Sequence, residues 1–117
     1  MDANTIIGYV ALTDKGKALG NKTSYVIAGS EENMKIYISK LTTRSIHVYK
    51  LREISFGEIL ERLRQGLSFV FDEKSYHRFL PLARQVGIEL AEEKFPADSV
   101  EKLHFVDVGI PKSKIFP

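Results

Sequence analysis

The stretch SFGEILERLRQGLSFVFDEKSYHRFLPLARQVG, residues 55–87, decides the fold of this chain. It predicts a helix, a strand and a second helix in succession. Ser55 and Glu58 stand three residues apart, which is the spacing of a capping box at a helix N-terminus. Gly66 suits the left-handed residue that ends a helix. The apolar residues between these signals repeat at helical spacing and predict one buried stripe, formed by Phe56, Ile59, Leu60 and Leu63.

The second half of this stretch predicts a strand followed by a longer helix. Residues 67–71 are rich in aromatic and β-branched side chains, which favours a buried strand. Asp72 is a strong N-cap residue, and Gly87 suits the C-terminal end of the helix that follows. Pro81 falls within the apolar face of this helix, so the sequence predicts a kink or a break near Leu80.

Further strands are predicted on both sides of this unit. They are residues 5–12, 23–28, 45–51, 88–95 and 103–108. We expect the first two to pair as a wide antiparallel hairpin. The acidic residues within 88–95 favour an exposed sheet edge, because charges protect unpaired edges from aggregation.

Residues 31–41 predict a helix, because Glu31 and Glu32 suit its first turn. A strand is the alternative, since apolar residues also alternate between 34 and 38. The whole pattern predicts an α+β fold with a mixed sheet of about five to six strands and two to three helices, in the order β-β-α-β-α-β-α-β-β. The length fits a single domain over residues 1–117, with residues 109–117 as a C-terminal tail.

Composition narrows the class of protein. The chain has no cysteine, which excludes disulfides and thiolate metal sites and suits the reducing cytoplasm. Residues 1–12 carry no basic segment ahead of their apolar residues, and no apolar run is long enough to span a bilayer. We therefore expect a cytoplasmic protein without a membrane partner. We expect no metal and no cofactor, since the histidines lack metal-ligand spacing and no glycine-rich phosphate loop is present.

A basic segment is the main functional signal. The chain carries a net charge of +2, yet residues 35–52 contain five bases and no acid. Tyr37 and Tyr49 lie among these bases, and aromatic residues interleaved with bases can stack on nucleobases and contact phosphates. The same charges could meet an acidic protein or the acidic C-terminal part of a second copy, residues 89–107. The predicted binding residues are Lys35, Lys40, Arg44, Lys50 and Arg52.

A second signal points to another class of function. His77, Tyr76 and Arg78 are adjacent in the sequence and could supply a general acid or base with a cationic stabiliser. Residue type alone is weak support for catalysis, because the groups must also converge in one pocket. The sequence therefore favours a small intracellular, non-catalytic binding or accessory module, acting through a protein or nucleic-acid surface. The alternative is a small metal-independent, nuclease-like hydrolase.

Overall fold

The computed structural model describes residues 3–13, 24–41, 49–90, 92–99 and 103–109. Within them the chain forms five strands in two hydrogen-bonded sheets, and three helices, which confirms the predicted α+β class. The strands are β1 (Ile6–Leu12), β2 (Ser24–Ile27), β3 (Lys50–Ser55), β4 (Ser68–Asp72) and β5 (Phe105–Gly109). The helices are α1 (Glu31–Leu41), α2 (Phe56–Arg64) and α3 (Glu73–Gln85), so the helical reading of residues 31–41 is confirmed.

The two sheets are joined at one bridge. β1 pairs antiparallel with β3, while β2 pairs parallel with β4 and β4 pairs antiparallel with β5. Between the sheets, the Tyr9 N–H donates to the Ala28 carbonyl at 2.7 Å, and the Ala28 N–H donates to the Tyr9 carbonyl at 3.1 Å. The expected β1–β2 hairpin is thus reduced to this antiparallel bridge, and the ladder of β1 is made with β3 instead.

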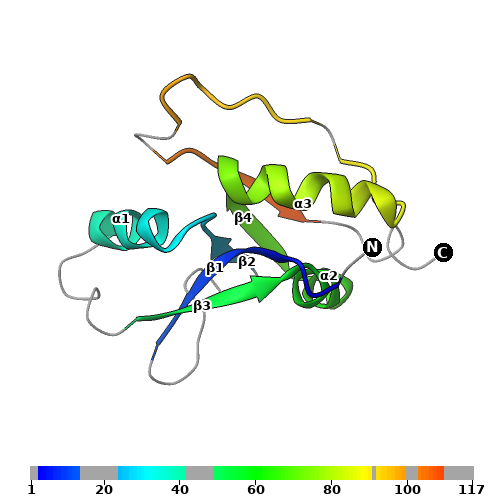
Figure 1. Cartoon of the computed structure of the whole chain (residues 1–117), viewed down its shortest axis with the longest axis horizontal. Helices are drawn as coiled ribbons and strands as arrows, with labels where there is room; N and C mark the ends of the chain where they lie inside the picture. Colours follow the sequence, from blue (N-terminus) through cyan, green and yellow to red (C-terminus); the bar gives the residue numbers. More distant parts are fainter. Residues whose placement is uncertain (1–2, 14–23, 42–48, 91, 100–102, 110–117) are drawn as a thin grey trace.

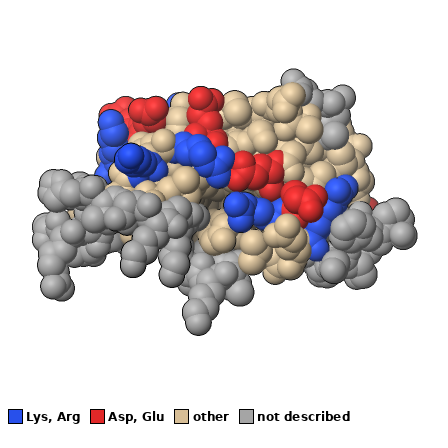
Figure 2. All heavy atoms as spheres, turned by 90° about the horizontal axis from the view of Figure 1, so that it is seen from below, with Lys and Arg blue, Asp and Glu red and all other residues tan. Residues whose placement is uncertain are grey.

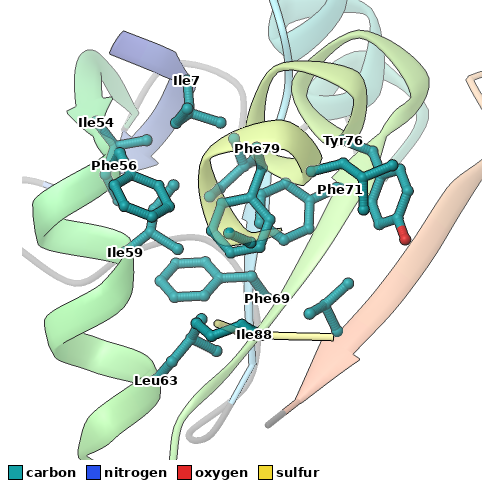
Figure 3. Close-up of a cluster of buried hydrophobic side chains, with 14 of the residues drawn as sticks. Ile7, Ile54, Phe56, Ile59, Leu63, Phe69, Phe71, Tyr76, Phe79 and Ile88 are labelled. Atoms are coloured by element: carbon teal, nitrogen blue, oxygen red, sulfur yellow. The ribbon is translucent and has the colours of Figure 1, made fainter. Parts of the chain in front are cut away.

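Helices lie on both faces of the strands (Figure 1). The larger core cluster unites α2, α3, β1, β2 and β4, and side chains of β4 sit at its centre (Figure 3). There Phe71 stacks on Phe79 with ring centroids 4.9 Å apart. The smaller core cluster lies on the opposite face, under α1, and consists of Ala11, Val26, Ala28, Met34 and Ile38. Alternation along β4 sends Phe69 and Phe71 to the larger cluster and Val70 to the smaller one.

The predicted helix ends are confirmed, with one change. The Ser55 hydroxyl accepts from the Glu58 N–H at 3.3 Å, and Asp72 caps α3 by accepting from the Ser75 N–H at 2.9 Å. Gly66 and Gly87 have φ values of +88° and +85°, the left-handed conformation that glycine adopts without strain. The Glu58 carboxylate accepts two hydrogen bonds from the Arg52 guanidinium on β3, from Nη1 at 2.8 Å and from Nη2 at 2.7 Å. The capping-box spacing does not predict this contact.

Three predicted details differ from the structure. Residues 88–90 and 92–95 form no strand: Leu90 and Phe95 pack against the larger core cluster, and none of the described strands pairs with them. The third strand is Lys50–Ser55 rather than 45–51, and residues 42–48 lie outside the described residues. α3 continues through Pro81 without a break, and buried residues on both sides of the proline hold it, namely Phe79, Leu80 and Ala83.

Candidate functional site

The most elaborate polar arrangement is buried and holds the fold together. The Asp72 side chain is at the C-terminal end of β4 and accepts from the Gly29 N–H at 3.0 Å, beyond the end of β2. It also accepts from the Asn33 side chain at 3.0 Å and from the Ser75 hydroxyl at 2.7 Å. Because Asp72 is 2% exposed and its acceptors are used in these bonds, it fastens α1 and α3 to the ends of the parallel strands.

The three catalytic candidates do not converge. The Tyr76 side chain is 2% exposed and packs edge-on against Phe71, and its burial raises the pKa of the phenol. Arg78 donates to the carbonyls of Gly29 at 2.7 Å and Ile7 at 3.2 Å, so its guanidinium ties α3 to the strands. His77 is largely exposed, with its Nε2 4.0 Å from a carboxylate oxygen of Glu73.

Four of the five predicted basic residues fall in the described part of the chain, and they lie on two sides of β3. Lys50 and Arg52 alternate with Leu51, which packs against the smaller core cluster, so these two bases face the α2 side. Lys35 and Lys40 lie on α1, which covers the other face, and Arg44 lies outside the described residues. Figure 2, which views the molecule from below, shows basic and acidic side chains next to one another, and the described residues form no extended basic surface there.

Arg52 is already engaged. Its guanidinium makes two hydrogen bonds to the Glu58 carboxylate, and Arg62 approaches the same carboxylate at 3.5 Å. The hydrogen bonds from Arg52 and the charge beside it lower the pKa of Glu58, and the same contact raises the pKa of Arg52. A paired guanidinium binds an added phosphate less well than a free one, since the two anions compete for the same donors.

The backbone of β3 offers an open edge. The N–H and C=O of Tyr9 are used by Ala28, so they point away from β3, and Tyr9 stands opposite Glu53 in the β1–β3 ladder. In an antiparallel ladder, both residues of such a pair direct their backbone groups away from each other. The backbone groups of Glu53, and of Leu51 two residues earlier, therefore point to the outer side of β3. No third strand in the described part of the chain pairs with that side.

Arg52 also covers part of this edge. Its Nη1 donates to the outward carbonyl of Glu53 at 3.1 Å, while the same side chain is held by Glu58. The β3 edge is defined here as the outward backbone groups of Leu51 and Glu53, with the flanking side chains of Lys50 and Arg52. Sequence reasoning missed this edge because β1 and β3 are far apart in the chain, and only the Tyr9–Ala28 bridge reveals which groups face outward.

The remaining features give weaker indications of a functional site. An open pocket of about 370 Å³ lies at the end of α3, lined by Arg84, Gly87, Ile88, Glu89 and Leu90. The Arg84 guanidinium there donates to the Leu90 carbonyl at 3.3 Å. Across the described residues, no group of three His, Asp or Glu side chains could hold a metal ion. None of the helices in these residues is long and apolar enough to cross a bilayer.

Comparison with known proteins gives no relative. No family model, no curated protein and no solved structure matches the chain.

Proposed function

We propose that this protein is a non-catalytic binding module that receives an extended segment of a protein partner at the β3 edge. The observation that carries the proposal is the outward direction of the Leu51 and Glu53 backbone groups, fixed by the Tyr9–Ala28 bridge. Such groups form main-chain hydrogen bonds with an added strand, and the side chains beside them select its sequence. The cysteine-free composition suits action in the cytoplasm.

The alternatives have less support. A hydrolase needs the His77 and Arg78 side chains in one pocket, whereas Arg78 binds two backbone carbonyls and His77 is largely exposed beside Glu73. Nucleic-acid binding needs a continuous basic surface, whereas Arg52 is paired with Glu58 and the four predicted bases within the described residues lie on two sides of β3.

A proline at position 53 tests the proposal. Glu53→Pro removes an N–H that points away from β1, so the β1–β3 ladder keeps its hydrogen bonds while the edge loses a donor. Glu53→Ala is the matched control, because it removes the same side chain and keeps the N–H. Thermal unfolding of both variants should give similar midpoints, since neither loses a ladder bond.

The assay is quantitative capture from lysate of the source cells, with wild type and both variants as bait. The proposal predicts a protein that binds wild type and Glu53→Ala, is lost with Glu53→Pro, and crosslinks to Lys50. If no captured protein distinguishes the two variants, the proposal is wrong. If wild type and Glu53→Pro instead capture the same amount of RNA or DNA, and moderate salt releases it, the result would favour a nucleic-acid partner.

A further inference from the structure

The two faces of the β3 edge differ in chemistry. Arg52 stands opposite Val10 in the β1–β3 ladder, and Val10 belongs to the larger core cluster, so Arg52 lies on the α2 face. Leu51 stands opposite Ala11, which belongs to the smaller core cluster under α1. The side chains of β3 therefore alternate between an α2 face and an α1 face, and a strand added to the edge would meet both.

The α2 face of the edge is basic. Lys50 and Arg52 are exposed there, and α2 lies beside β3 (Figure 1). The Glu58 carboxylate on α2 lies 2.7 Å from the guanidinium of Arg52 and 3.5 Å from that of Arg62. Three positive charges are thus grouped around one negative charge, and this excess favours acidic side chains on an added strand.

The α1 face combines apolar surface with one acid. Tyr49 and Leu51 pack against the smaller core cluster but are only partly buried, so each keeps some exposed surface on the outer strand of the sheet. Apolar side chains on an added strand would bury that surface and strengthen the contact. Glu53 is exposed on the same face, which favours a basic side chain opposite it.

Arg52 also influences which strands can be added. Its Nη1 donates to the outward Glu53 carbonyl at 3.1 Å and to the Glu58 carboxylate at 2.8 Å. An added strand needs this carbonyl as an acceptor, so Arg52 must release it. A carboxylate opposite Arg52 offers the guanidinium a charged acceptor in exchange, and such charge-assisted bonds are stronger than bonds to a neutral carbonyl. An acid at this position therefore frees the edge as well as pairing with it.

We propose that the segment received at the β3 edge alternates acidic and apolar side chains. Its acids lie opposite Lys50 and Arg52. Its apolar residues lie opposite Tyr49 and Leu51, and a basic residue lies opposite Glu53. This inference rests on the proposed function and names the chemistry of its partner. The β3 strand of a second copy does not fit this pattern, because two such strands sharing their faces would set Arg52 against Arg52 or Lys50.

NMR titration of the isotope-labelled protein with short synthetic peptides tests the inference. The end-capped peptide Thr-Lys-Glu-Val-Glu-Val-Thr places the proposed side chains opposite residues 49–53 in antiparallel pairing, and its reversed sequence does so in parallel pairing. One of the two should shift the amide signals of residues 51 and 53. We expect a dissociation constant between about 10 µM and 1 mM, because one short strand makes a small contact. The matched control peptide, Thr-Glu-Glu-Lys-Val-Val-Thr, has the same composition without the alternation and should bind at least about tenfold more weakly.

A charge exchange at position 50 tests the pairing directly. Lys50→Glu should weaken the binding of the alternating peptide about three- to tenfold, because two acids then face each other. Replacement of the facing acid of the peptide by lysine should restore the binding. Lys35→Glu on α1 makes the same change of charge away from the edge, and it should bind the original peptide like wild type. Glu53→Pro should abolish binding, whereas Glu53→Ala should keep most of it.

Four results would overturn the inference. The first is the absence of amide shifts at residues 51 and 53 with either peptide at about 2 mM, above the expected range. The others are equal binding of the control peptide, a charge exchange that restores nothing, and binding that survives Glu53→Pro. If any of these occurs while lysate capture still depends on the N–H of residue 53, the acidic and apolar pattern is wrong and the proposed function stands.

Discussion

Replacement of Asp72 should be among the most damaging single changes outside the apolar core. In Asp72→Ala, the N–H groups of Gly29 and Ser75 lose their acceptor inside the protein. Each buried donor left without a partner costs about 1–3 kcal/mol, and loss of an N-cap costs about 1 kcal/mol, part of which is the same Ser75 bond. We therefore expect a loss of about 3–5 kcal/mol in the free energy of unfolding.

Asp72→Asn separates hydrogen bonding from shape. The amide keeps the volume but offers one acceptor oxygen, and its NH₂ group must face donors on Gly29, Asn33 or Ser75. We expect a loss of about 2–3 kcal/mol, reduced when Asn33→Ala removes one of the opposing donors. Ser75→Ala is the matched control, since it removes one hydroxyl donor and should cost about 1 kcal/mol.

The assay is urea unfolding followed by circular dichroism, with the slope checked for each variant. A loss below about 0.5 kcal/mol for Asp72→Ala, the range of ordinary surface substitutions, would refute the assignment of Asp72 as the tie between α1 and α3.

Three further predictions concern α2 and can be checked by the same unfolding assay. Leu63→Ala should lower the free energy of unfolding by about 2–5 kcal/mol, because Leu63 is 0% exposed. Leu60→Ala should lower it by less, because Leu60 is only partly buried, and equal losses for the two variants would contradict this packing. Ser55→Ala should cost about 1 kcal/mol through loss of the N-cap, and an unchanged midpoint and slope would show that the cap contributes nothing. The pKa of Glu58 is lowered in the folded protein, so its pairing with Arg52 stabilises above the unfolded value of about 4.3 and is lost as the pH falls through the folded value. Glu58→Gln should therefore show a smaller loss of stability between pH 5 and strongly acidic solution, and an identical acid dependence would contradict the pair.

Local signals in the sequence were sufficient for the ends of α2 and α3, although the break expected near Leu80 was wrong. The Ser55 and Asp72 caps and the left-handed Gly66 and Gly87 are set by neighbours within a few residues, so the sequence contains the whole cause. The stripe on α2 was correct except that Leu60 is only partly buried.

Pairing between distant segments could not be predicted in this way. The sequence of residues 88–95 alternates like that of a strand, yet a strand also needs a neighbouring strand. Whether one is present depends on how distant segments of the chain pack. The absence of acids from residues 35–52 does not indicate that Arg52 bonds to Glu58, which lies six residues further along the chain. The links from Asp72 to Gly29 and Asn33 were equally hidden, although an acid directly after a buried strand was a signal that could have suggested them.

The ladder between β1 and β3 has a consequence for synthesis of the chain. Residues 6–12 are synthesised before their partners, residues 50–55, which follow some forty positions later. Until then an apolar segment of Ile, Val and Leu has no strand beside it, the condition in which nascent chains aggregate. The elements α2, β4 and α3 follow one another directly in the chain, so the contacts among these three elements can form soon after they have been made. The β1 ladder can therefore form only once residues 50–55 have been made, and the β2 ladder only once residues 68–71 have followed.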